Sequence, residues 1–358
     1  MTISGSSDTH AADQPWLRRF AILLCVATVA LIFLGGQVKS HEAGLSVPDW
    51  PMTYGENPLT YPVSKWTGGV FHEHFHRLWA GGVASLTFVL AVWLTIAARR
   101  RGLKVLGWLA VVTVLLQAVM GGLTVLLKLP VHVSSTHAIL AQSFLLILVF
   151  IAYGLTRERD RLAAQSTVRG GPTFRGAVLI IAIIYGQLFL GALMRHTESG
   201  LAIPDFPTMG GQIIPRFDDA MLHNINDWRL EYSFNNERGV DLPEANLGQV
   251  AIHFAHRVGA VLLTAVIVVL AIRARRGGAP RPVRKSYHYL CMLLGLQLVL
   301  GMCTIWTAKA PWVTSLHVVT GACVLVLAGL LAARAWFLGE AREEAPHVVT
   351  DRAHVAHT

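Results

Sequence analysis

Residues 34–51 read LGGQVKSHEAGLSVPDWP, and residues 190–207 read LGALMRHTESGLAIPDFP. The two stretches share the pattern E-x-G-L-x-x-P-D-x-P, and each follows the end of a long apolar run. Glycine and proline at such spacings favour tight turns, so both stretches are expected to form similar loops. A polar loop pattern that returns after 156 residues predicts that the chain consists of two related halves.

Further matches extend the repeat beyond the loops, at a spacing of 180 residues. Repeated apolar segments alone would be weak evidence, but these matches include histidine, arginine and glutamine. The change in spacing places about 24 additional residues in the loop region of the second half. The matched pairs are His76–Arg77 with His256–Arg257, Gln117 with Gln297, Gly121 with Gly301, Thr124 with Thr304, Ser135 with Ser315, and His137 with His317.

The composition is that of an all-α integral membrane protein. Apolar residues make up 53% of the 358 residues, charged residues make up 14%, and the mean hydropathy is +0.50. A helix of about 20 apolar residues spans a bilayer. Eight runs of this kind predict eight transmembrane helices. The predicted spans are 17–38, 70–98, 105–127, 133–155, 175–195, 248–272, 286–307 and 312–337.

Basic residues gather in alternate loops, near 18–19, 99–104, 157–175 and 273–285, and in the tail after Arg334. The positive-inside rule then places both termini on the cytoplasmic side of a bacterial plasma membrane, or on the matrix side of a mitochondrial inner membrane. The loops over 39–69 and 196–247 are expected to face outward. The net charge of +9 therefore reflects membrane topology and does not indicate a nucleic-acid partner.

Each repeat contains four helices, so both halves enter the membrane in the same sense and form a parallel repeat. We expect two four-helix bundles, an architecture that builds cofactor sites from side chains on facing helices. The predicted organisation is a disordered tail over 1–16, an N-terminal bundle over 17–156, a cytoplasmic linker over 157–174, a C-terminal bundle over 175–338 and a tail over 339–358.

Four histidines lie near the starts of the second, fourth, sixth and eighth predicted helices: His76, His137, His256 and His317. Imidazole is rarely placed in lipid without a partner. Each bundle would contain one facing pair of imidazoles at similar depth. Neutral imidazole binds iron, zinc or copper, and a symmetric pair in apolar surroundings favours the axial ligation of a haem in each half. Taken singly, each histidine also fits a hydrogen-bonded structural role.

Arg77 and Arg257 directly follow two of these histidines. Arginine forms bidentate pairs with carboxylates, so a haem propionate that points outward would attract them. The alternative is a pair of interfacial arginines whose side chains reach the lipid headgroups.

Glu73 lies three residues before His76 and shares a helical face with it, whereas the matching residue in the second half is His253. A buried acid beside one site only suggests proton-coupled chemistry in the first half and electron transfer in the second. The alternative is an interfacial ion pair between Glu73 and Arg77. His72 lies on the same face and remains a secondary candidate for this site, as His253 does in the second half.

The aspartates of the twin loops, Asp49 and Asp205, are expected to hold these loops as structural lids, in preference to a catalytic role. The cysteines lie inside predicted helices, which favours apolar packing over a disulfide framework or a metal site. They are Cys25, Cys291, Cys303 and Cys323.

With these residues assembled, the chain resembles the haem A synthase family, membrane enzymes of terminal-oxidase assembly. The resemblance covers nearly all of residues 17–338 and rests on the two four-helix repeats, the E-x-x-H-R motif at Glu73–Arg77, the H-R pair at His256–Arg257, and the PDW and PDF segments. It implies an oxidoreductase that converts the C8 methyl group of haem O into the formyl group of haem A. It also implies a permanent haem b on His256 and His317, and a substrate haem near His76, His137 and Glu73.

The implied reaction removes four electrons from a methyl group. Two successive hydroxylations would give a geminal diol that loses water, with haem b as the electron relay and Glu73 as the proton acceptor. The sequence shows no flavin, NAD or iron–sulfur motif, so a quinone or a redox protein is expected to exchange the electrons. Haem O synthase and oxidase assembly factors are expected partners, and a homo-oligomer is compatible with the sequence. Some bacterial members carry a cysteine pair in the first outer loop, but residues 39–69 contain no cysteine.

Two other classes remain open from the sequence. A dihaem membrane cytochrome would only pass electrons, would hold two permanent haems and would give Glu73 no role. A haem transporter or chaperone would use the histidines as transient stops, but sites near one membrane face argue mildly against transport.

Overall fold

The computed structural model describes residues 14–165, 169–235, 239 and 241–339. Within these residues the chain forms α-helices and two short 3-10 helices, η1 (Val63–Lys65) and η2 (Ser199–Leu201), and no β-strand. Eight of the described helices are long and apolar enough to cross a membrane, which confirms the predicted all-α, multi-pass fold. The predicted tails over 1–16 and 339–358 lie almost entirely outside the described residues.

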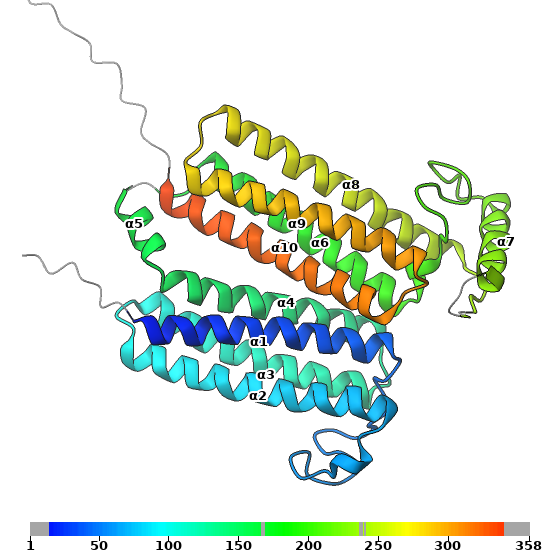
Figure 1. Cartoon of the computed structure of the whole chain (residues 1–358), viewed down its shortest axis with the longest axis horizontal. Helices are drawn as coiled ribbons and strands as arrows, with labels where there is room; N and C mark the ends of the chain where they lie inside the picture. Colours follow the sequence, from blue (N-terminus) through cyan, green and yellow to red (C-terminus); the bar gives the residue numbers. More distant parts are fainter. Residues whose placement is uncertain (1–13, 166–168, 236–238, 240, 340–358) are drawn as a thin grey trace, which may run out of the picture.

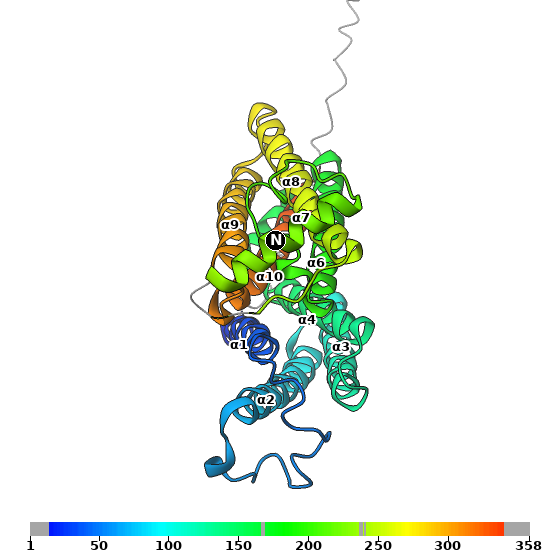
Figure 2. The ribbon, with the colours of Figure 1, turned by 90° about the vertical axis from the view of Figure 1, so that its right-hand side faces the viewer.

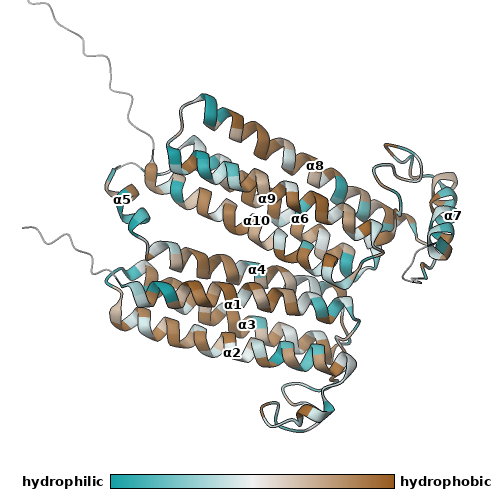
Figure 3. Cartoon of the chain, in the orientation of Figure 1, coloured by the Kyte–Doolittle hydropathy of each residue, from teal (hydrophilic) through white to brown (hydrophobic). Residues whose placement is uncertain are grey.

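Each predicted span coincides with one of the eight long helices. The helices are α1 (Pro15–Ser40), α2 (Gly68–Ala97), α3 (Arg101–Leu126), α4 (Val131–Gly154), α6 (Pro172–His196), α8 (Leu247–Arg276), α9 (Arg281–Trp306) and α10 (Pro311–Leu338). Most helices extend up to five residues beyond the predicted ends, whereas α2, α3, α4 and α9 each end one residue before the predicted end. In Figure 3, helices such as α8 and α9 continue from an apolar middle into hydrophilic end turns, which lie outside the apolar runs of the sequence.

Local signals fix several helix starts. Proline occupies the first turn of α1, α6, α9 and α10, where its missing N–H would have no helical partner in any case. Asn246 begins α8 with a capping box, in which its side chain accepts from Gln249 N and the Gln249 side chain accepts from Asn246 N. These caps satisfy backbone donors that neither lipid nor the helix itself can satisfy.

The long helices pack in two rings of four (Figure 1). In the first ring α1 contacts α2 and α4, and α3 contacts α2 and α4; in the second, α6 contacts α8 and α10, and α9 contacts α8 and α10. The rings meet where α1 contacts α10 and where α4 contacts α6 and α10. Figure 2 shows the result from the loop end: α2 and α3 lie at one side, α8 and α9 lie at the other, and the remaining four helices lie between them.

Each ring is solidly packed at one end. In the first ring the buried core includes Leu24, Leu94 and Phe144, and in the second it includes Ile184 and Leu325. The core residues come from the N-terminal parts of α1, α3, α6 and α9 and from the C-terminal parts of α2, α4, α8 and α10. All of these parts lie at the end opposite the loops, so the space between the helices at the loop end is left for a site.

Two helices were not predicted. The segment expected as a linker over 157–174 contains α5 (Arg157–Gln165), where Glu158 pairs with Arg334 of α10 at 2.8 Å. The extra loop of the second half contains α7 (Asp219–Asn235), which stands outside the bundle in Figure 1. Neither helix was predicted, because both are too short and too polar to form an apolar run of membrane-spanning length.

The described chain ends and α5 lie at one end of the molecule, whereas both long loops and α7 lie at the other (Figure 1). The loops predicted to face outward are therefore on a common side. We call this side, with the loops over 41–67 and 197–246, the loop end.

Candidate functional site

A cavity of about 2500 Å³ occupies the loop end of the two rings and continues from one ring into the other. The four predicted histidines all line it: His76 and His137 in the first ring, and His256 and His317 in the second. A pocket for one drug-sized ligand has roughly 300–1,000 Å³. The volume therefore suits two large ligands, one beside each histidine pair.

The two imidazoles of the second ring lie close together on the cavity wall. The ring centroids of His256 and His317 are 6.5 Å apart, with an angle of 64° between the ring planes. Metal–nitrogen bonds of about 2 Å on opposite faces of one iron, with about 1 Å more from each nitrogen to its ring centre, place the centroids roughly 6 Å apart. By distance alone, His256 and His317 could therefore hold one metal-containing group between them.

A glycine faces each histidine ring, and a methyl group built on any of the four glycines would lie only 3.1–3.2 Å from an imidazole atom. Such contacts are tighter than ordinary van der Waals contact, so a side chain at these positions would push the ring aside. The absence of a side chain at each glycine therefore leaves the space that the imidazole ring occupies. The pairs are Gly35 with His76, Gly121 with His137, Gly191 with His256, and Gly301 with His317.

Glutamine side chains contact three of the four histidines. Gln117 donates to His137 O at 2.9 Å, and its Nε2 lies 3.4 Å from the His137 ring. Gln297 Nε2 lies 3.3 Å from His317 Nε2. In each contact the amide nitrogen can donate to an unprotonated ring nitrogen, and this contact helps to fix the orientation of the ring.

The first loop is fastened over the cavity by Arg77 and Glu73. Arg77 donates to Val47 O and Asp49 O, both at 2.7 Å, and pairs with Glu73 at 2.5 Å. Glu73 also accepts a hydrogen bond from Val47 N at 2.8 Å, and its side chain is only 5% exposed. The ion pair weighed as an alternative is therefore present, and both residues also line the cavity.

The second loop is fastened by the corresponding residues with different chemistry. Arg257 donates to Ile203 O at 3.0 Å and to Asp205 O at 2.8 Å. His253 takes the place of Glu73: its Nδ1 accepts from Ile203 N at 3.2 Å, and its Nε2 lies 3.3 Å from Arg257 Nε. Both guanidinium groups thus contact loop carbonyls, a partner that the propionate hypothesis did not include.

The two loop aspartates hold tight turns. Asp49 accepts from Tyr54 N at 2.9 Å and from Gly55 N at 2.8 Å. Partial burial opposes ionisation, but these backbone hydrogen bonds outweigh it and lower the pKa of Asp49 below its usual value. Asp205 accepts in the same way from the N–H groups of Gly210 and Gly211. These contacts agree with the structural role expected for both residues.

Trp50 anchors the first lid in the bundle. A methyl group on Gly122 of α3 would lie 2.5 Å from the Trp50 ring, so the indole lies directly on the helix backbone. Trp50 and Pro51 line the cavity in the first half, and Phe206 and Pro207 line it in the second. The loops therefore form part of the cavity wall.

The secondary candidate His72 is turned elsewhere. Its ring stacks on His41 with centroids 4.2 Å apart and planes 10° apart. It is not among the residues that line the cavity, whereas Glu73 and His253 are. Of the candidates on this face, only His72 is thus placed outside the site.

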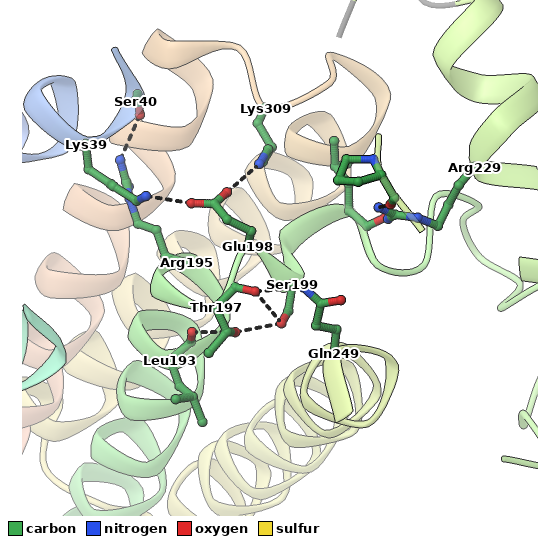
Figure 4. A network of polar contacts seen from close by, with 12 residues as sticks. Lys39, Ser40, Leu193, Arg195, Thr197, Glu198, Ser199, Arg229, Gln249 and Lys309 are labelled. Atoms are coloured by element: carbon green, nitrogen blue, oxygen red, sulfur yellow. Dashed lines mark hydrogen bonds and ion pairs between the residues drawn. The ribbon is translucent and has the colours of Figure 1, made fainter. Parts of the chain in front are cut away.

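A charged cluster joins the two halves at the mouth of the cavity (Figure 4). Glu198 lies between Lys39 of α1, at 2.6 Å, and Lys309 from the turn before α10, at 3.1 Å. Burial opposes ionisation of Glu198, but the hydrogen bond from Lys39 and the charge of Lys309 outweigh it and lower its pKa. Arg195 crosses the same seam and donates to Gly36 O and Ser40 Oγ, both at 2.7 Å.

Among the described residues, no group of three or more histidine, cysteine or acidic side chains could hold a metal ion, and Cys25, Cys291, Cys303 and Cys323 are free. A haem differs from a bare ion because its macrocycle supplies four nitrogens and the protein need supply only axial ligands. Paired imidazoles, the glycine-made space around them and the size of the cavity therefore fit haem.

Sequence reasoning missed three parts of this site. The glycines facing the histidines carried a signal, because Gly35 matches Gly191 and Gly121 matches Gly301 in the repeat. Gln187, which contacts His256, gave no such signal in the sequence, because the matching residue of the first half is Leu31. The Glu198 cluster joins residues from both halves, and no local sequence pattern predicts ion pairs between such distant segments.

The chain is similar to known proteins along most of its length. The family model described as Cytochrome oxidase assembly protein (COX15-CtaA) matches residues 18–329. The Heme A synthase of Methylobacterium radiotolerans is 28% identical, over 92% of this chain and 91% of that protein. The Heme A synthase of Novosphingobium aromaticivorans is 27% identical, over 94% and 97%, and that of Halalkalibacterium halodurans is 26% identical, over 84% and 91%.

Proposed function

Because this chain belongs to the cytochrome oxidase assembly protein family, we propose that it is a haem A synthase, an oxidoreductase that converts haem O into haem A. The observation that carries the proposal is the placement of two histidine pairs on one cavity that spans both rings. A single pair would suit a simple cytochrome site. Two connected sites suit an enzyme that holds its substrate beside a second redox group.

The second ring is proposed to hold haem b on His256 and His317, whose separation fits one iron. The first ring is proposed to hold the substrate haem on His76 and His137. This division assigns the acidic side chain, Glu73, to the substrate and its neutral counterpart, His253, to the cofactor. It also treats the two rings as the parallel repeats predicted from the sequence.

Haem b bound in the second ring supplies an electron relay for the oxidation. The residues of the chain position the substrate and handle protons. The imidazoles of the first ring fix the substrate iron, and the lid with Trp50 and Pro51 covers the cavity and limits access of water. If water supplies the oxygen atom, two hydroxylations and loss of water from the diol convert the methyl group to a formyl group and release four protons with the four electrons, and the electrons would pass to the quinone or redox protein. Glu73 is the carboxylate on the cavity wall best placed to accept the protons, and its partner Arg77 can balance its charge.

Electrons must be exchanged with a quinone or a redox protein, and haem O must come from a haem O synthase. We propose a location in the bacterial plasma membrane, or the mitochondrial inner membrane, with the loop end outward. The basic residues at the opposite end support this orientation. Oxidase assembly factors are proposed partners, and a homo-oligomer remains compatible with the exposed apolar helix faces.

The direct test is to extract the haems from purified protein and to separate them by chromatography. We expect haem b together with haem O, haem A or a partly oxidised intermediate. Haem b alone, also from cells that make haem O, would favour a dihaem cytochrome, and the proposed enzymatic function would fail.

The proposed proton role predicts a large effect of Glu73→Gln. The glutamine keeps the shape and can still accept a hydrogen bond from Val47 N, but it cannot take up a proton at neutral pH. Loss of a positioned acid–base group typically lowers a rate by ~10²–10⁴. We therefore expect haem A production to fall by about this factor, while haem b is retained and haem O or an intermediate accumulates in cells.

The matched control is His253→Gln at the equivalent position of the second half. It should alter the spectrum or potential of haem b more than it affects the oxidation itself. A near-normal yield of haem A from Glu73→Gln at equal expression would reduce Glu73 to a loop fastener. The proton acceptor would then have to be sought among His72, His74, Glu42 and Asp49.

A further inference from the structure

The two halves differ in what supports the histidine on the second helix of each ring. In the second half, Gln187 of α6 donates to His256 O at 2.7 Å, and its Nε2 lies 3.2 Å from His256 Nδ1. The equivalent of Gln187, at the 156-residue spacing, is Leu31, an aliphatic residue of the cavity wall. Within the described parts of the chain, no residue is hydrogen-bonded to the ring of His76.

The space around these side chains differs in a complementary way. A methyl group on Gly259 of α8 would lie 2.2 Å from Gln187 Oε1, so the carboxamide occupies space that only glycine leaves free. The equivalent of Gly259, at the 180-residue spacing, is Trp79, whose indole donates to Ala27 O at 2.9 Å. The second half thus has glutamine with glycine, where the first half has leucine with tryptophan.

We propose that Gln187 is a positioning residue that makes His256 a permanent haem ligand, and that the Leu31–Trp79 pair leaves His76 free to release its haem. The assignment of the permanent and the exchangeable haem rests on the proposed function. The asymmetry meets a requirement of that function, because the product must leave the first site while the cofactor stays in the second.

The physical basis is the hydrogen bond on the far side of a metal-binding imidazole. Such a bond fixes the orientation of the ring and tunes its basicity, and its loss typically costs about 10–100-fold in metal affinity. Gln187 engages one nitrogen of His256 and leaves the other for iron. Gln187 Oε1 is buried without a partner. If iron takes the other nitrogen, Nδ1 carries the proton, and Gln187 can accept from it only by turning Oε1 toward the ring and giving up its bond to His256 O.

The test measures how fast haem leaves the protein. Full-length protein in detergent is mixed with excess apomyoglobin, and the transfer of haem is followed by absorbance. Gln187→Leu should lose haem b about 10–100-fold faster than wild type. Gln187→Glu, which places an acceptor beside the ring, should lose haem b more slowly than Gln187→Leu and should show a lower midpoint potential, because a carboxylate favours the oxidised iron. The control, Gln165→Leu, removes an exposed glutamine of α5 that is not part of the cavity wall, and it should leave the loss of haem b unchanged.

The reciprocal experiment transplants the pair into the first half. The double variant Leu31→Gln/Trp79→Gly should retain more haem per chain and transfer its first-half haem to apomyoglobin more slowly. The proposal is overturned if folded Gln187→Leu loses haem b at the wild-type rate. If that variant does not fold, an unchanged first-half transfer rate in the double variant overturns it. Extracts that contain only haem b would refute the proposed enzyme, while faster loss from Gln187→Leu would still establish the role of Gln187.

Discussion

His76→Ala and His137→Ala are each expected to abolish haem A formation while haem b stays in the purified protein. Both residues line the first-ring part of the cavity, and each faces a glycine that leaves room for its imidazole. Even an outer partner of a metal ligand is worth about 10–100-fold in affinity or activity, so loss of the ligand itself should cost more than 100-fold. The measurement is the ratio of haem A to haem O in membranes, together with the haem b content of the purified variant.

The chain provides a matched control on the same helix as His137. His132 lies one turn earlier on α4, is exposed and is not part of the cavity wall, so His132→Ala should leave both measurements unchanged. If His76→Ala or His137→Ala removed all haem from well-folded protein, the division of labour between the rings would be wrong.

The second large effect is expected from His256→Ala and His317→Ala, each of which should remove most of the haem b from purified protein. Their centroids are 6.5 Å apart, and each variant would remove one of the two imidazoles proposed to hold haem b. Haem A formation should then also be lost, because the proposed electron relay is missing. The absorbance of the purified protein and a pyridine haemochrome assay measure this loss.

His288→Ala is the corresponding control, since His288 is exposed on α9 and lies outside the cavity wall. It should retain the wild-type spectrum. An unchanged low-spin haem spectrum in both His256→Ala and His317→Ala would show that haem b binds elsewhere.

Hydropathy predicted the eight spans because a bilayer demands long apolar helices and leaves few alternatives. Helix ends were less predictable, since α8 continues to Arg276 and α9 begins at Arg281, both beyond the apolar runs. The four histidines were predicted from their repeated spacing, and the structure places all of them on one cavity. Their ligation of haem remains a prediction.

What the sequence could not predict depends on contacts between distant segments. The role of Glu73 as a loop fastener requires that Val47 N be 2.8 Å away, which its spacing to His76 does not indicate. Gln187 contacts His256, 69 residues later, and lacks a counterpart in the repeat. The helix α7 belongs to the extra loop residues of one half, where no comparison between halves can help.

The charged cluster at the seam also affects how a ligand would orient in the cavity. Lys39, Lys309 and Arg195 lie around the carboxylate of Glu198, so at this seam three cationic side chains accompany one acidic side chain. A tetrapyrrole with both carboxylates on one edge is negatively charged at that edge and apolar at the opposite edge. The cationic side chains favour an orientation in which the acidic edge lies toward the loops and the hydrocarbon edge lies toward the buried core. Two such molecules, one in each ring, would then both point their acidic edges toward the loop end.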